Sequence, residues 1–371
     1  MELPPRWKVH RELMRLKRQA KNLRYRITDP INREIWDARR PLRLKPVDGA
    51  VPLRDDVAIF LVYQPNRCPE SLFTSLQYLV DEGFSPLVVS NLPLSERDLD
   101  RLKSLAWKVV ERPNLGYDFG GYRDGVWLLD HLEIAPKSLL FVNDTIWFPV
   151  SPSADVFGRL RALDAPYLGL TDAYNFDYGG KNHADKGRPG LIHVTSFFFW
   201  IKDPMLSSEA FRNWWPSYPL DSRKRYVVRH GEVGFFTAMK EAGFTYDALI
   251  KKEDLLAHVD GLDRDGLIAL LGQLSIVLSM YKDELDAVNT AIADSSVTRE
   301  QLHHLIWDVV RVVNPSDLMA YEGIRRMNFP FLKKTILKNK RVRDHFLARN
   351  AEEPLDIDPQ IIAEMADLRY G

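Results

Sequence analysis

From Asp56 onward the chain alternates short, wholly apolar runs with longer segments of helical periodicity, and this alternation constrains the fold more than any other feature. Residues 57–62 contain no polar side chain, which is typical of a strand buried on both faces of a parallel sheet. A helical pattern follows over 69–84, and a second apolar run over 87–89. This spacing predicts right-handed βαβ units, and therefore an α/β fold with a mostly parallel sheet.

The same alternation continues to about residue 250. It predicts further strands over 107–110, 138–142 and 194–201, and helices over 96–106, 154–163, 207–215 and 232–242. Beyond Leu255 the periodicity is helical to the end. We therefore expect three parts: a basic helical extension (1–50), an α/β domain (51–255) and a helical C-terminal region (256–371).

The composition excludes several classes of protein. Among 371 residues, Lys and Arg number 51 and so do Asp and Glu, whereas nucleic-acid binding calls for a basic excess. Cys68 is the single cysteine, which excludes a disulfide framework and a multi-cysteine zinc site. We expect a reducing compartment, the cytoplasm.

The N-terminal segment departs from this balance. Residues 1–45 hold 14 Lys and Arg side chains against 5 Asp and Glu, with Trp7, Leu13, Leu16 and Leu23 spaced among them. The segment lacks the apolar core of a secretory signal, and the uncharged stretch 266–281 is too short to span a bilayer. Two interpretations stay open: a solvated basic helix packed on an acidic body, or a peripheral anchor on an anionic membrane surface.

Three groups of residues are candidates for a functional site. The first is the glycine-rich segment 114–123, expected as a loop between a predicted strand and the next helix. Ligands of open α/β sheets bind beyond the carboxyl ends of strands, where such loops lie. Its glycines would let the backbone approach a phosphate or sugar, with Asp118 as an acceptor and Arg123 as an anion clamp. Alternatively, the glycines make a tight turn and Arg123 pairs with Asp124 or Asp130.

The second group is Asn143 and Asp144, directly after the apolar run 139–142. A carboxylate at the exit of a buried strand is well placed to bind Mg²⁺ or Mn²⁺ that bridges a diphosphate. The alternative is an Asx turn that ends the strand.

The third group is His230 and Glu232, at the start of a predicted helix. The helix dipole would keep Glu232 ionised, and an ionised carboxylate beside a cleft can act as a general base; the alternative is a glutamate that only helps the helix to begin. His193 and Ser196 precede another apolar run and are candidate ligand contacts or structural groups. The loop 175–190, rich in glycine and basic residues, is a candidate lid.

In this order, segments 114–123, 140–145 and 193–199 resemble the rhamnan synthesis protein F family. The same resemblance extends to Glu232 with the helix end at 242–244, and to residues 314–315 followed by 329–334. It covers about 56–340. The family comprises bacterial enzymes of surface polysaccharide assembly, related to inverting glycosyltransferases. It implies a GT-A-like, Rossmann-like domain: a mixed, mostly parallel sheet flanked by helices, with a C-terminal helical region.

The resemblance also implies an activity. The chain would move a sugar, with L-rhamnose as one candidate, from a nucleotide diphosphate donor to a growing bacterial surface polysaccharide or lipid-linked glycan. dTDP-rhamnose is the favoured donor. Glu232 stands at the position of the catalytic base and Asp144 at that of the metal motif, while His193, Ser196 and His230 would contact acceptor or donor. The nucleotide-sugar contacts would be Tyr63, Gly116, Tyr117, Asp118, Gly120, Gly121, Arg123 and Asn143.

Two other functions remain open. The family's metal motif and base motif each carry a second carboxylate that this sequence lacks, which favours a non-catalytic component that binds glycan or a partner in an assembly complex. A metal-dependent nucleotide-sugar hydrolase, with water as acceptor, is the third. A basic N-terminus would suit an enzyme at the inner face of the cell membrane.

Overall fold

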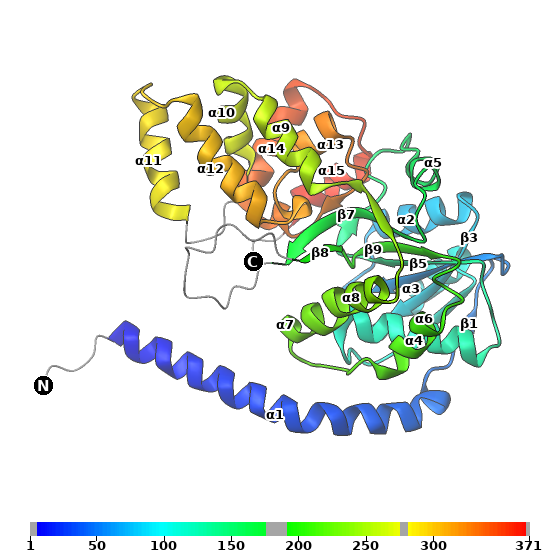
Figure 1. Cartoon of the computed structure of the whole chain (residues 1–371). Helices are drawn as coiled ribbons and strands as arrows, with labels where there is room; N and C mark the ends of the chain where they lie inside the picture. Colours follow the sequence, from blue (N-terminus) through cyan, green and yellow to red (C-terminus); the bar gives the residue numbers. More distant parts are fainter. Residues whose placement is uncertain (1–5, 176–190, 275–280, 369–371) are drawn as a thin grey trace, which may run out of the picture.

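The computed structural model describes residues 6–175, 191–274 and 281–368. Its centre is a mixed sheet with the strand order β1-β4-β3-β2-β5-β9-β7-β10, and β8 pairs with β7 (Figure 1). The strands are β1 (Val47–Asp48), β2 (Asp56–Val62), β3 (Phe84–Ser90), β4 (Lys108–Glu111), β5 (Ser138–Asn143), β7 (Tyr167–Asn175), β8 (Leu191–Val194), β9 (Phe198–Lys202) and β10 (Tyr246–Ile250).

Most of the sheet is parallel. Strands β4, β3, β2 and β5 pair in parallel, and β10 pairs in parallel with β7. Strand β9 lies between β5 and β7 and runs antiparallel to both. Strands β5 and β7 therefore run in the same direction. The predicted mixed, mostly parallel sheet flanked by helices is confirmed.

The sheet separates two hydrophobic cores. Alternate residues of a strand point to opposite faces, so Phe60 packs in one core and Ile59 in the other. The first core is completed by α2 (Glu70–Asp81), α3 (Glu96–Leu105), α5 (Val156–Arg161) and several C-terminal helices. The second is completed by α4 (Tyr117–His131), α6 (Glu209–Ser217), α8 (Gly234–Glu241) and Trp36 of α1 (Arg6–Arg43). Both faces of β2 are therefore covered, as its apolar sequence predicts.

The C-terminal region returns to the sheet. Its short strand β11 (Leu332–Lys333) pairs antiparallel with β6 (Ile146–Trp147), which follows β5. This pairing brings the residues after Phe331 to the carboxyl end of β5. The other elements of the region are α9 (Lys252–Gly261), α10 (Arg264–Gln273), α11 (Lys282–Ala293), α12 (Arg299–Val312), η3 (Pro315–Asp317), α13 (Tyr321–Met327), η4 (Ile336–Lys338), α14 (Lys340–Glu352) and α15 (Pro359–Ala366).

Helix α1 has 38 residues. Its C-terminal half lies beside α4 and α6, and its N-terminal half stands away from the body (Figure 1). Within the described residues, no helix is both long enough and apolar enough to cross a bilayer.

Three local expectations differ from the structure. Segment 114–123 is not a free loop, because α4 begins at Tyr117. The single strand expected over 194–201 is two strands, β8 and β9, joined by a turn. The helix expected from Glu232 begins earlier, at Lys224. The predicted lid lies, apart from Asn175, outside the described residues.

Candidate functional site

Several predicted site residues meet at the carboxyl ends of β2 and β5. Asp144 follows β5 and is 8% exposed. Its carboxylate Oδ2 accepts the backbone N–H of Tyr63 at 2.7 Å and the side-chain amide of Gln64 at 2.8 Å. Both partners follow β2, so the aspartate joins the ends of two adjacent parallel strands, at the edge where open α/β sheets bind ligands.

Asn143, the last residue of β5, links this edge to helix α4. Its amide Nδ2 donates to Asp118 Oδ2 at 3.1 Å. Its Oδ1 accepts the backbone N–H of Thr145 at 3.1 Å, which is an Asx turn. The turn that the sequence offered as an alternative is therefore present, and it leaves the Asn143 amide hydrogens to orient Asp118.

The start of α4 has an unusual backbone. Gly116 and Tyr117 adopt left-handed conformations, with φ of 73° and 51°. For a bulky residue such as Tyr117 this conformation costs roughly 1–3 kcal/mol. Strained residues of this kind cluster at functional sites, and here the strain directly precedes Asp118.

The carboxyl group of Asp118 has a raised pKa. Burial raises the pKa of its carboxyl to about 6, and the nearby carboxylates of Asp144 and Glu232 add to the rise. The ammonium groups of Lys224 and Lys333 oppose it. Asp144 and Glu232, from separate parts of the chain, are thus close enough to disfavour ionisation of Asp118. We call these three residues the carboxylate cluster.

Glu232 lies in a different hydrogen-bonding environment. His193 Nε2 lies 2.9 Å from its Oε1. Its Oε2 accepts the backbone N–H of Ser196 at 2.8 Å and also the Ser196 hydroxyl. Burial acts to raise the pKa of Glu232, but these bonds and the charge of His193 lower it to about 2. The structure therefore brings Glu232, His193 and Ser196 together, and their hydrogen bonds hold Glu232 ionised.

The reason for that ionisation differs from the one expected. Glu232 is not in the first turn of a helix, because α7 (Lys224–Val227), the π-helical turn η1 (Val228–Val233) and α8 follow one another without a break. Its charge is stabilised by His193 and Ser196 rather than by a helix N-terminus. π-helical turns inside α-helices occur frequently at functional sites.

The structure adds site residues that sequence reasoning missed. Tyr122 is fully buried, donates its hydroxyl to the Ser196 carbonyl at 3.0 Å, and has its pKa raised by burial and then by Asp118. Lys334 donates its backbone N–H to the Thr145 carbonyl at 3.0 Å, and its ammonium charge lowers the pKa of Asp144 against the effect of burial. Its place in the segment 329–334 was the only signal in the sequence.

Some predicted residues lie elsewhere. Arg123 is 3% exposed, and its guanidinium binds both carboxylate oxygens of Asp37 in α1, at 2.6 and 2.7 Å. Arg123 thus joins α4 to α1 through an ion pair. It is neither an anion clamp nor the partner of Asp124 or Asp130. His230 is exposed, with its ring 5.6 Å from that of Tyr226.

The paired glycines are needed for packing. A Cβ on Gly121 would lie 2.1 Å from Leu61 Cδ1, and one on Gly120 would lie 1.9 Å from the Leu115 carbonyl oxygen. Both glycines are buried. Gly121 therefore allows α4 to approach β2, and Gly120 allows the turn before α4 to pack closely on the first turn of that helix.

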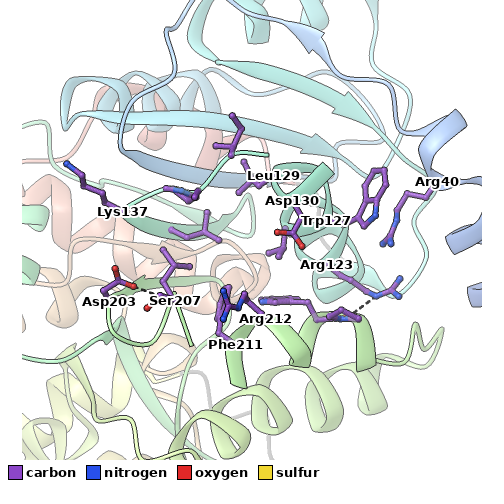
Figure 2. Close-up of a pocket in the computed structure, with 18 residues that line it drawn as sticks. Arg40, Arg123, Trp127, Leu129, Asp130, Lys137, Asp203, Ser207, Phe211 and Arg212 are labelled. Carbon is purple, nitrogen blue, oxygen red and sulfur yellow. Dashed lines mark hydrogen bonds between the residues drawn. The ribbon is translucent and has the colours of Figure 1, made fainter. Parts of the chain in front are cut away.

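A cavity of about 470 Å³ lies at the other end of the strands, near the residues that precede β5. Figure 2 shows Trp127, Leu129 and Phe211 among its lining, with Arg123 and Arg40 at the side of α1. Of the predicted site residues, Arg123 alone lines it. The carboxylate cluster and this cavity are therefore separate features.

Similarity to solved structures extends to two fungal enzymes. The mannosyltransferase Ktr4p from S. cerevisiae is 12% identical, with a TM-score of 0.28, over 57% of this chain and 72% of that one. Core-mannan synthase A from Aspergillus fumigatus, in a Mn/GDP form, is 14% identical, with a TM-score of 0.28, over 51% of this chain and 68% of that one.

Two sequence comparisons are more specific. "Uncharacterized protein y4gN" of Sinorhizobium fredii (strain NBRC 101917 / NGR234) is 32% identical over 285 residues, which is 75% of this chain and 72% of that protein. The family described as rhamnan synthesis protein F matches residues 87–265. This range includes Asp118, Asn143, Asp144, His193, Ser196 and Glu232. On these grounds the chain belongs to the rhamnan synthesis protein F family.

Proposed function

We propose that this chain is a glycosyltransferase that moves a sugar from a nucleotide diphosphate donor to a glycan acceptor, with inversion at the anomeric carbon. The observation that carries the proposal is the arrangement at the carboxyl ends of β2 and β5, in a chain of the rhamnan synthesis protein F family. There Asp144 accepts the backbone N–H that follows β2, the adjacent Asn143 binds Asp118, and the charges of Asp144 and Glu232 act on Asp118. L-rhamnose from dTDP-rhamnose, added to a surface polysaccharide or its lipid-linked precursor, is the proposed reaction.

An inverting transfer is a single in-line displacement. The acceptor hydroxyl loses its proton to a base as its oxygen bonds to the anomeric carbon, and the nucleotide diphosphate leaves from the opposite face with the electron pair of the broken bond. Preorganised positive charge stabilises such a leaving group. Lys224, Lys333 and Lys334 supply charge of that sign beside the carboxylates.

We assign the proton transfer to Asp118. A general base works best when its pKa is close to the working pH, and burial brings the pKa of Asp118 to about 6. The carboxylate of Glu232, with a pKa of about 2 and hydrogen bonds to both oxygens, is the weaker base. In this proposal Glu232 is a positioning residue that holds His193 and Ser196.

A divalent cation, Mg²⁺ or Mn²⁺, has few ligands here from the protein. Among the described residues, no three His, Cys, Asp or Glu side chains gather in a way that could hold one. Asp144 would contribute one carboxylate, and phosphate oxygens of the donor would have to complete the coordination. Any such cation would add to the charge that the lysines already provide.

A second candidate function has its own supporting observation. Both oxygens of Glu232 are engaged by His193 and Ser196, and an acid held in this way can serve structure alone. The chain would then bind glycan or a partner in a polysaccharide assembly complex without turnover.

The test is sugar transfer from dTDP-, UDP- and GDP-sugars, with and without Mn²⁺, followed by NMR of the anomeric centre in the product. We expect transfer from one donor class and an acid limb in the pH profile near 6. Asp118→Asn should lower kcat by about 10²-fold or more, whereas Asp130→Asn, at the exposed far end of the same helix, should leave it unchanged.

The outcomes separate the candidates. Full turnover by Asp118→Asn together with loss in Glu232→Gln would return the base to Glu232. Glycan binding with no turnover of any donor would favour the assembly component, and donor hydrolysis without transfer would favour a hydrolase.

A further inference from the structure

Helix α1 faces the body with its polar side. Ser222 donates its backbone N–H and hydroxyl to the Asp29 carboxylate at 2.9 and 2.8 Å. Arg33 donates to the Pro216 carbonyl at 2.7 Å. These residues lie four positions apart, on one side of the helix.

The same side continues toward the C-terminal end of α1. Trp36 Nε1 donates to the Asp124 carboxylate at 3.0 Å, and Arg40 donates to it at 3.2 Å. Asp37 accepts both guanidinium contacts of Arg123. Hydrogen bonds over three turns therefore fix the rotation of α1 about its own axis.

This rotation leaves an apolar stripe in water. Leu23, Ile27, Ile31 and Ile35 are 60%, 61%, 55% and 46% exposed. A step of four residues advances about 40° round a helix, so the four side chains span about 120° and run about 18 Å along the axis. Leu42 continues the stripe and is 74% exposed. A contiguous apolar surface of this kind marks an interaction site.

The charge of α1 identifies the kind of partner. Exposed basic side chains on the helix are Arg15, Lys17, Arg24, Arg26, Arg39 and Arg43. The exposed acids among its described side chains are Glu12 and Glu34. An apolar face bordered by basic residues is the pattern of a helix that lies in the interface of an anionic bilayer, where each Lys or Arg near the surface adds roughly 1 kcal/mol of attraction.

We propose that α1 is a membrane-docking arm, which lays the stripe of Leu23, Ile27, Ile31 and Ile35 into the surface of an anionic lipid bilayer. The hydrogen-bonded polar side keeps the body above that surface. The proposal is independent of the reaction assigned to the carboxylate cluster, since it rests on α1 alone.

The test is flotation of the full chain with vesicles of phosphatidylcholine, with or without added phosphatidylglycerol. We expect binding to the anionic vesicles that weakens as salt is raised. The triple variant Leu23→Ser, Ile27→Ser, Ile31→Ser should lower the apparent affinity at least about tenfold, because it removes apolar surface that would enter the interface. Leu53→Ser, which replaces an exposed leucine of the body, is the matched control and should bind as the unaltered chain does.

A second variant tests the charge. Arg24→Gln, Arg26→Gln and Arg39→Gln together should lower binding to anionic vesicles and weaken its salt dependence, because the other basic side chains of α1 remain. Circular dichroism confirms that each variant stays folded. Equal binding to both vesicle types, or unaltered binding by the triple serine variant, would overturn the proposal. So would a dimer in solution that the serine variant converts to monomer, with no vesicle binding, because a second copy would then cover the stripe.

Discussion

The central sheet and helix α1 present their apolar side chains in opposite ways. Strand β2 buries both faces, with Ile59 and Phe60 in different cores. Helix α1 buries a polar side through Asp29, Trp36 and Arg40 and leaves Ile31 in water. The difference shows that an apolar pattern identifies a surface to be covered, while tertiary contacts decide whether the protein itself covers it.

The largest effect should come from the sheet. Phe141 on β5 is fully buried and stacks on Phe199 with 4.4 Å between ring centres. Phe141→Ala should lower the free energy of unfolding by about 3–5 kcal/mol, because the lost transfer energy adds to that of a cavity. Urea unfolding measures it. A loss below about 1 kcal/mol would mean that this core is loosely packed.

Next in size is the polar contact that holds α1. Asp124 is fully buried and accepts from Arg112 Nε at 2.6 Å as well as from Trp36 and Arg40. Asp124→Ala leaves Arg112 as a buried cation without this partner, so we expect a loss of about 3 kcal/mol and faster proteolysis within α1. Asp130→Ala on the same helix is the control. Unchanged proteolysis would show that α1 is held by other contacts.

A smaller effect on stability should come from Glu232 in the candidate site, and this effect depends on pH. The pKa of Glu232 is lowered to about 2 from an ordinary value of 4.5, so its ionised form stabilises the fold above pH 4.5, and this contribution disappears as the pH falls toward 2. Lowering the pKa from 4.5 to about 2 corresponds to about 3 kcal/mol. Glu232→Gln should lose part of this, about 2 kcal/mol at pH 7, because the Gln amide can still hydrogen-bond Ser196, and it should show a flatter stability curve below pH 4.5. Parallel curves for the two proteins would refute the assigned pKa.

The smallest effect should come from the stripe. Ile31 is 55% exposed, and Ile31→Ala in the absence of lipid should change the free energy of unfolding by no more than about 0.5 kcal/mol. A loss comparable to that of Phe141→Ala would break the comparison, because the stripe would then be covered in solution.

Part of the site could be predicted. Glu232 stood out because it opens a predicted helix. Asp118, Asn143 and Asp144 stood out because polar residues that follow apolar strands gather at the carboxyl ends of the strands of a parallel sheet. Arg123 stood out for the same reason and lies elsewhere, because its partner Asp37 is distant in the sequence. Lys334 gave little signal, because its position depends on the pairing of β11 with β6.

The sequence by itself determined the α/β class and the strands at its centre, because short apolar runs that alternate with helical segments are typical of a parallel sheet covered on both faces. It also determined that α1 is basic and amphipathic. Only the tertiary structure decided which side of α1 faces the body, and that Glu232 lies in a π-helical turn between His193 and Ser196. Those outcomes depend on contacts between segments far apart in the chain, and a local sequence pattern does not predict the energies of such contacts.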